Sequence, residues 1–333
     1  MYETLENDNV SCDTCNRRCV IPPGKLGFCQ SRENRNGRLY SLEYGLISSL
    51  SINPIEKKPL FHFYPGTSFL TVGSWSCTFT CPWCQNCDIS KVAPKKKELQ
   101  SQLIDPEKLV KMAKENNCRG TSMSFSEPTT FLEYAVDVFE LARQNGLANT
   151  VVTNGYFTPE AADLLIDRGA DAFNIDIKGD LKTYEKYCSA DSEKVWANIK
   201  RIKEKGVHVE LTTLVIPGAN DSNGCLRGIA ERIGKEAGLD TPWHVSRYFP
   251  AYKFEAPPTP IASLERAYEI GKDAGLLYVY LGNVSDHKYE NTYCPACGEN
   301  LIKRTIFTVH WNKITKDRKC PNCGQDVPIV ISS

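Results

Sequence analysis

Two hydrophobic periodicities alternate along the middle of the chain. Short apolar runs that are typical of buried strands lie at 67–75, 120–126, 148–155, 170–179, 207–218 and 242–249. Segments with helical patterning stand between and after them, at 106–117, 130–146, 158–169, 193–206, 223–238 and 260–275. Such β/α alternation predicts a parallel sheet with right-handed crossovers. We therefore expect an α/β fold, a partial (β/α)6 barrel of the TIM-like kind.

The two ends of the chain differ from this middle part. Residues 39–52 alternate between apolar and polar and predict a strand or hairpin that leads out of an N-terminal group of cysteines. A second group of cysteines lies near the C-terminus. We expect three units: a metal module with lead-in strands over 1–52, the barrel over 53–288, and a rubredoxin-like or zinc-ribbon module over 289–333.

Charge and hydropathy exclude some partners. The 333 residues carry 40 Lys and Arg against 40 Asp and Glu, so no overall basic field attracts nucleic acid or an anionic membrane. No apolar run approaches the ~20 residues that span a bilayer. The acidic N-terminus, MYETLENDNV, is unlike a secretory signal. We expect a cytoplasmic protein without nucleic-acid or membrane partners.

The chain has 15 cysteines, and 12 of them fall into three groups of four. Because the cytosol keeps thiols reduced, clustered cysteines indicate metal or redox chemistry rather than disulfides. The remaining three stand alone, and a buried small hydrophobic residue is the favoured interpretation for each: Cys118, Cys188 and Cys225.

Polar residues follow the ends of the predicted strands, where chemistry collects in parallel α/β folds. This position is occupied by Cys77, Glu127, Thr153, Asn154, Asp176, Lys178 and the turn 217–221, and His244 and Arg247 lie along the sixth strand.

The stretch SWSCTFTCPWCQNCDIS, residues 74–90, contains C-x3-C-x2-C at Cys77, Cys81 and Cys84. Three thiolates in one loop can bind three irons of a [4Fe–4S] cluster, and the fourth iron then stays open for a small molecule. A zinc site that uses all four cysteines is the alternative, but zinc knuckles normally place their pairs on either side of a longer loop. Cys87 could close the cluster; we expect it to stay unbound while a ligand occupies the open iron.

This motif, with the aromatic Trp83 before its last cysteine, resembles that of the radical S-adenosylmethionine (SAM) superfamily. The chain is similar to the pyruvate formate-lyase activating enzymes and, more narrowly, to the AmmeMemoRadiSam radical SAM enzymes, named for genes commonly found beside theirs. The stretches that carry the resemblance span almost the whole chain: IEKKPLFHFYPG (55–66), CPWCQN (81–86), SEPT (126–129), VTNGY (152–156), NIDIKG (174–179), LVIPGAND (214–221), SRYFPAYK (246–253) and YVYLGNV (278–284).

The resemblance implies roles for individual residues. Glu127 corresponds to the acid of the Gly-Gly-Glu motif and would hold the SAM amino group, although Phe125 and Ser126 replace the two glycines. Asp176 and Lys178 match an Asp-x-Lys signature that binds the ribose and the carboxylate. The other implied contacts to SAM are Thr153 and Asn154, Pro217 with Gly218 near the adenine, and His244.

The resemblance also implies an activity. A reduced [4Fe–4S] cluster cleaves SAM to methionine and a 5′-deoxyadenosyl radical, which abstracts hydrogen from a substrate. The implied enzyme is an oxidoreductase with a reductant such as ferredoxin or flavodoxin and a protein substrate, as in glycyl-radical activases; Memo-like neighbours are further candidate partners. Radical modification of a small molecule and a non-catalytic, zinc-rich binding protein are the alternatives.

The two flanking groups of cysteines also have metal-ligand spacing. Cys294, Cys297, Cys320 and Cys323 form paired C-x2-C knuckles, which predict a tetrahedral site for zinc or iron. Cys12, Cys15, Cys19 and Cys29 follow C-x2-C-x3-C-x9-C, and an auxiliary [4Fe–4S] cluster and a zinc ion are equally compatible with that spacing.

Overall fold

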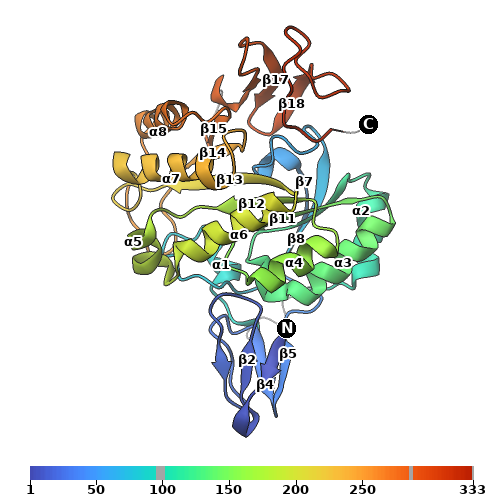
Figure 1. The fold of residues 1–333 in the computed structure, drawn as a ribbon. Helices are drawn as coiled ribbons and strands as arrows, with labels where there is room; N and C mark the ends of the chain where they lie inside the picture. Colours follow the sequence, from blue (N-terminus) through green and yellow to red (C-terminus); the bar gives the residue numbers. More distant parts are fainter. Residues whose placement is uncertain (95–101, 285–287, 332–333) are drawn as a thin grey trace.

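The computed structural model describes residues 1–94, 102–284 and 288–331 (Figure 1). The middle of the chain forms a sheet with helices packed beside it. The N-terminal segment, here residues 1–48, projects from one side of this core, and the C-terminal segment, residues 288–331, lies on the opposite side. The two four-Cys groups of the flanks are therefore far apart in space.

The central sheet has eight strands in the order β15-β14-β13-β12-β11-β10-β8-β7. The seven strands from β8 to β15 are parallel, and β7 pairs antiparallel with β8. The predicted six-stranded β/α core is thus present, and β15 and β7 each add one strand at an edge. The strands are β7 Ser49–Pro54, β8 Ser68–Gly73, β10 Gly120–Met123, β11 Ala148–Thr153, β12 Ala172–Asp176, β13 His208–Val215, β14 Trp243–Arg247 and β15 Val279–Gly282.

Helices connect consecutive parallel strands and cover one face of the sheet (Figure 1). Sequence signals mark where α4 begins: the side chain of Thr158 accepts a hydrogen bond from Ala161 N, and Pro159 occupies the first helical position. The described helices are α1 Cys87–Ser90, α2 Pro106–Glu115, α3 Leu132–Gln144, α4 Pro159–Asp167, α5 Leu181–Thr183, α6 Ser192–Glu204, α7 Asn223–Glu236 and α8 Ile261–Asp273. Shorter helical turns are Glu6–Asp8, Ile55–Lys57, Pro128–Phe131, Tyr184–Cys188 and Lys288–Glu290.

Close packing of the strands requires a glycine at residue 120. Gly120 begins β10 between Phe69 of β8 and Ala148 of β11, and a Cβ atom there would stand 1.9 Å from the carbonyl oxygen of Ala148. Every residue of β10 is buried, as expected when a parallel sheet has both faces covered. A side chain at residue 120 would force the middle of the sheet apart.

The N-terminal segment is built from small sheets that rest on the barrel. Its strands are β1 Tyr2–Thr4, β2 Val10–Cys12, β3 Val20–Ile21, β4 Arg32–Arg35, β5 Arg38–Ser41 and β6 Leu46–Ile47, and β6 pairs with β9 Gln102–Leu103. Asn16 ties the segment to the loop after β11, because its backbone N donates to Tyr156 O at 2.9 Å and its amide to Phe157 O at 2.7 Å. β7 spans the predicted domain boundary at residues 52 and 53.

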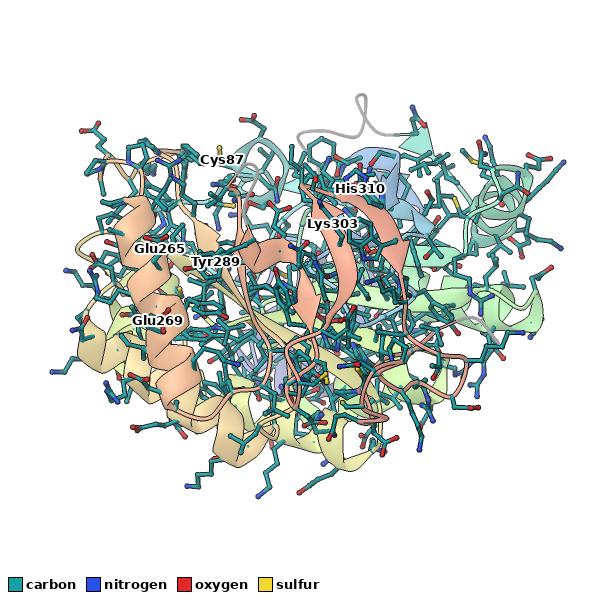
Figure 2. All side chains as sticks on the ribbon, turned by 90° about the horizontal axis from the view of Figure 1, so that it is seen from above. Cys87, Glu265, Glu269, Tyr289, Lys303 and His310 are labelled. Carbon is teal, nitrogen blue, oxygen red and sulfur yellow. The ribbon has the colours of Figure 1, made fainter. Side chains whose placement is uncertain are left out.

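The C-terminal segment is a three-stranded antiparallel sheet of β16 Thr292–Tyr293, β17 Asn300–Thr305 and β18 Thr308–Asn312. Figure 2, which looks down on it, shows Lys303 and His310 on β17 and β18. The buried guanidinium of Arg304 attaches the segment to the barrel by donating to Phe61 O at 2.8 Å. Across the described ranges, no helix combines the length and the apolar character that crossing a bilayer requires.

Candidate functional site

A cavity of about 760 Å³ lies at the carboxyl ends of the parallel strands. Three elements contribute to its wall: the cysteine loop after β8, the strand ends of the sheet, and the hairpin between β17 and β18. Of the site residues predicted from the sequence, ten line it: Cys77, Cys81, Trp83, Cys84, Glu127, Thr153, Asn154, Asp176, Lys178 and His244. The topology thus brings together residues as far apart in sequence as Cys77 and His244.

Hydrogen-bond donors surround the sulfurs of the cysteine loop. The Cys77 sulfur accepts from Phe79 N at 3.4 Å and from the amide of Asn154 at 3.7 Å. The Cys84 sulfur lies 3.0 Å from the hydroxyl of Ser90. Such donors stabilise thiolates and tune iron–sulfur clusters. Three cysteines on one loop, open to one cavity, therefore fit the ligand set of a cluster.

Cys188, expected to be a buried hydrophobic residue, is buried as predicted, but its sulfur also lies 3.4 Å from that of Cys81. It ends a π-helical turn, Tyr184–Cys188, a distortion that is frequent at functional sites. The Cys188 thiol is the largest influence that lowers the pKa of Cys81, and Lys178 and Lys91 add to it against burial. A lone cysteine 107 residues away in sequence gives no signal that could have revealed this contact.

Glu127 is buried in the loop after β10 and accepts four hydrogen bonds. Its Oε1 accepts from Thr129 N at 3.1 Å, Thr129 Oγ1 at 2.5 Å and Thr153 Oγ1 at 2.7 Å, and its Oε2 accepts from Asn154 N at 2.9 Å. Burial raises the pKa of Glu127, and these hydrogen bonds oppose the rise. Since Oε2 accepts a single bond from the described protein, it keeps capacity for a cationic donor.

Phe125 stands where the resemblance expects a glycine, and it adopts a left-handed backbone with φ of +67°. This conformation is uncommon for a bulky side chain and clusters at active sites. The backbone shape that glycine would allow is thus kept although the residue differs.

Asp176 and Lys178 form an ion pair of 2.7 Å at the end of β12. Burial lowers the pKa of Lys178, but the negative charges of the Asp176 carboxylate and of the Cys81 and Cys188 thiolates outweigh burial and leave this pKa well above its usual value. The hydroxyl of Tyr184 accepts from Lys178 N at 3.1 Å and donates to Asp176 O at 3.2 Å, which fixes the strand end.

His244 reaches the cavity from β14 but already has a strong partner. Its Nε2 lies 2.6 Å from Oε2 of the buried Glu210, which also accepts from Phe61 N and His62 N. Burial raises the pKa of Glu210, but the hydrogen bonds from His208 and His244 outweigh burial and lower this pKa far below its usual value. His244 is therefore held in place by the core and can offer only its other ring nitrogen.

Four candidate residues do not line the cavity: Pro217, Gly218, Arg247 and Cys87. Pro217 lies in a turn after β13 whose Asn220 donates to Lys178 O at 2.9 Å, so this turn supports the strand end that carries Lys178. Cys87 begins α1 beside the cysteine loop, and Figure 2 labels its position. The structure does not bring Cys87 to the cavity wall with Cys77, Cys81 and Cys84.

Lys58 is a cavity residue that the sequence analysis missed. It is only 3% exposed, and its Nζ lies 4.2 Å from the ring centroid of Phe125. Burial lowers the pKa of Lys58 to about 7, and the neighbouring Lys57 adds to this effect. Among the residues that the structure describes, no carboxylate forms an ion pair with Lys58. Its place in the conspicuous stretch IEKKPLFHFYPG was the available signal.

The C-terminal cysteines form a compact group. The Cys294 and Cys323 sulfurs are 3.6 Å apart, and those of Cys297 and Cys320 are 3.7 Å apart. Zinc–thiolate bonds of about 2.3 Å in a tetrahedron give sulfur separations of about 3.8 Å. All four ligand atoms lie within 4.8 Å of one another, so the predicted single-ion site fits.

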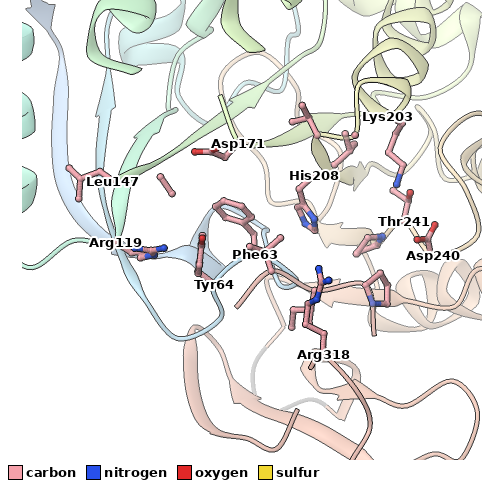
Figure 3. Close-up of a pocket in the computed structure, with 18 of the residues that line it drawn as sticks. Phe63, Tyr64, Arg119, Leu147, Asp171, Lys203, His208, Asp240, Thr241 and Arg318 are labelled. Atoms are coloured by element: carbon pink, nitrogen blue, oxygen red, sulfur yellow. The ribbon is translucent and has the colours of Figure 1, made fainter. Parts of the chain in front are cut away.

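A second pocket, of about 570 Å³, lies at the other end of the sheet (Figure 3). Its wall includes Arg119 and Asp171, which precede β10 and β12, and His208, which begins β13. These are the amino ends of parallel strands, where conserved chemistry is not expected in barrel folds. The pocket is therefore separate from the cysteine cavity.

Comparisons with known proteins agree with the site. The family model of the radical SAM superfamily matches residues 75–223. An uncharacterised protein of Methanocaldococcus jannaschii is 43% identical over 332 residues, 99% of this chain and 98% of that protein. A second protein of that organism, named for the activation of glycyl-radical enzymes, is 23% identical over 69% of this chain and 93% of its own.

Among solved structures, Streptococcus suis SuiB bound to S-adenosylmethionine is similar in fold, with a TM-score of 0.51 and 12% identity over 72% of this chain and 56% of SuiB. The family match begins two residues before Cys77 and covers the cysteine loop and the ends of β10 to β13, whereas the ends of β14 and β15 lie outside it. The chain therefore contains a radical SAM domain over residues 75–223.

Proposed function

We propose that this protein cleaves SAM reductively and uses the resulting radical to abstract hydrogen from a protein substrate. The radical SAM domain implies a [4Fe–4S] cluster and SAM. The observation that supports the proposal most strongly is that one cavity at the strand ends is lined by the three motif cysteines and by the charged residues expected around SAM. The cluster, when bound, supplies one electron to SAM, which yields methionine and the 5′-deoxyadenosyl radical.

Cys77, Cys81 and Cys84 are the proposed ligands of this cluster. Their sulfurs are open to the cavity, and donors from Phe79, Asn154 and Ser90 reach two of them. Trp83 packs its ring 5.0 Å from that of Tyr187, which positions the loop between two of the ligands. The proposal leaves Cys87 unbound.

We assign each proposed contact residue to one part of SAM. Glu127, through Oε2, would accept from the amino group of the methionine part, and Asp176 and Lys178 would bind the ribose and the carboxylate. Thr153 and Asn154 would contact the ligand between these positions, and His244 would contact it from β14. For Pro217 we propose an indirect role near the adenine, because its turn supports the Lys178 strand end.

The substrate side of the cavity supports a peptide. Its rim includes three partly exposed apolar residues, Phe249, Ile306 and Phe307, of which the last two come from the C-terminal hairpin. Lys58 lies deeper and has no carboxylate partner among the described residues, so it favours an anionic group on the ligand. The relative named for activating glycyl-radical enzymes agrees with a protein substrate.

Ferredoxin or flavodoxin is the proposed reductant. The narrower assignment to the AmmeMemoRadiSam enzymes, with its Memo-like neighbours, stays a prediction.

The test uses a cell extract, separated by size into two fractions, as the source of substrate. The reconstituted enzyme, SAM and dithionite are mixed anaerobically with the retained or the filtered fraction of a cell extract after size separation, and 5′-deoxyadenosine is measured. A protein substrate predicts that stimulation lies in the retained fraction and disappears after protease treatment. Stimulation by the filtrate alone would overturn the protein assignment in favour of a small molecule.

Lys58→Met provides a matched test, with Lys57→Met as control because Lys57 is the exposed neighbour with the same charge. We expect the Lys58 variant alone to lose most of the stimulation while it keeps the slow, substrate-independent cleavage of SAM. Equal stimulation in both variants would contradict the proposed anion contact.

A further inference from the structure

The four N-terminal cysteines converge although their distances in sequence differ. Cys12, Cys15, Cys19 and Cys29 all line one small cavity in the N-terminal segment. Cys12 and Cys15 are buried, and all four are free thiols. The space left between the side chains is about 10 Å³, which corresponds to roughly one water position. A [4Fe–4S] cubane would fit only if the four cysteine side chains turned away from the centre of this cavity. A single zinc ion would fit only if they turned toward its centre.

The spacing of the sulfurs favours the cubane. Within the described part of the chain, the C-terminal cysteines are the one group of three or more metal-type side chains whose ligand atoms all lie within 4.8 Å of one another. The N-terminal sulfurs are therefore spread more widely than around a single ion, as are those of Cys77, Cys81 and Cys84. Thiolates around a [4Fe–4S] cluster stand apart because each binds a different iron.

A buried cation faces this cavity with an unused donor. Arg32 is 3% exposed, lines the cavity, and pairs through Nη1 with Glu133 Oε1 at 2.5 Å. Its buried Nε has no hydrogen-bond partner in the described structure. An unpaired buried N–H is costly, so its position beside four sulfurs points to an anionic acceptor. Four thiolates and the sulfides of a cluster provide such acceptors.

Hydroxyl groups complete the surroundings of the sulfurs. The Cys29 sulfur lies 3.1 Å from Ser31 Oγ, and the Cys12 sulfur lies 3.5 Å from Thr14 Oγ1. The cavity also adjoins the cysteine loop of the SAM site, because Ser76 Oγ donates to Cys29 O and Ser76 directly precedes Cys77. A cluster here would stand beside the radical SAM loop.

We propose that Cys12, Cys15, Cys19 and Cys29 hold a [4Fe–4S] cluster of their own, next to the site that cleaves SAM. The assignment does not depend on the proposed substrate or on SAM cleavage. It distinguishes the two flanks of the chain: a cluster at the N-terminal site and a single ion at the C-terminal site.

The first test removes the other cluster. The full-length variant Cys77→Ala/Cys81→Ala/Cys84→Ala is reconstituted anaerobically, and iron, zinc and acid-labile sulfide are counted, with Mössbauer spectra to identify the iron. We expect about four irons and four sulfides per chain to remain in a cluster, and to be lost when Cys15→Ser and Cys29→Ser are added. The C-terminal site adds one further zinc or iron without sulfide in both variants. A second single ion in place of the four irons, or no sulfide at all, would overturn the proposal.

The second test keeps every cysteine and reads the electrostatics of the remaining cluster. In the triple-alanine background, Arg32→Gln removes a positive charge and a donor beside the cluster, and we expect its reduction potential to fall. Glu133→Gln removes the negative partner of Arg32 and should raise the potential instead. Equal potentials in both variants would place the cluster elsewhere and refute the assignment to this cavity.

Discussion

Arg17 joins three parts of the molecule, and its removal gives a sharp prediction. Its guanidinium donates to Thr78 O at 3.0 Å and 2.8 Å, to Cys188 O at 3.1 Å and to Ser189 O. It also stacks over Phe28, with 3.8 Å between the guanidinium carbon and the ring centroid. The N-terminal segment is thereby held against the loop that carries Cys77 and against the turn that carries Cys188.

The magnitude follows from these contacts. Hydrogen bonds to a charged group contribute about 1.5–3 kcal/mol each, and the partial exposure of Arg17 lets water replace part of that. With three carbonyl acceptors and the ring contact, we expect Arg17→Ala to lower the free energy of unfolding by about 2–4 kcal/mol. The neighbouring Arg18 makes two exposed ion pairs, with Asp13 and Glu160, so Arg18→Ala should cost only about 0–1 kcal/mol.

Urea unfolding of both variants, followed by circular dichroism, measures this difference. Limited proteolysis adds a local readout, because Arg17→Ala should expose the 74–90 loop to cleavage, whereas Arg18→Ala should not. Equal unfolding midpoints for the two variants would refute the idea that Arg17 fastens the N-terminal segment to the site.

Three further predictions concern other parts of the structure. Burial lowers the pKa of His62 from 6.5 to about 4, so the free energy of unfolding should fall by up to about 3 kcal/mol as the pH drops from 6.5 to 4. His62→Gln should flatten this pH dependence, whereas His310→Gln, at an exposed histidine, should leave it unchanged. Because Phe125 has φ of +67°, Phe125→Gly should be about 1–2 kcal/mol more stable than Phe125→Ala in the same urea assay; a more stable alanine variant would contradict the strain. A chelator that strips the C-terminal metal should make residues 288–331 protease-sensitive while the barrel stays resistant, and uniform cleavage would argue against a metal-dependent segment.

The barrel was predictable because its signals are local. Each parallel strand is a short apolar run, and each crossover helix has its own apolar period. Some of these helices also begin at a capping residue, such as Thr158 before α4. The antiparallel β7 was not placed in the sheet by the sequence analysis. Its alternation fits any half-buried strand, and its pairing with β8 is set by tertiary packing.

The site was predictable where residues belong to motifs and unpredictable where it depends on contacts between distant segments. Cys77, Cys81 and Cys84 share one loop, and the charged residues follow strand ends. The contact of Cys188 with Cys81 and the burial of Lys58 arise only when the turn after α5 and the Ile55–Lys57 turn fold over the sheet. The left-handed backbone of Phe125 is likewise imposed by the strand end rather than preferred by its side chain.

The central claim is that three thiolates of one loop leave an iron open for SAM, and its most direct test is SAM cleavage itself. The protein and its Cys81→Ala variant are reconstituted anaerobically, mixed with SAM and dithionite, and analysed for 5′-deoxyadenosine by mass spectrometry. We expect product from the native chain and none from the variant. A native chain that holds a [4Fe–4S] cluster on the 77–84 loop, as judged by loss of that cluster in Cys81→Ala, yet forms no product even with cell extract, would contradict the account.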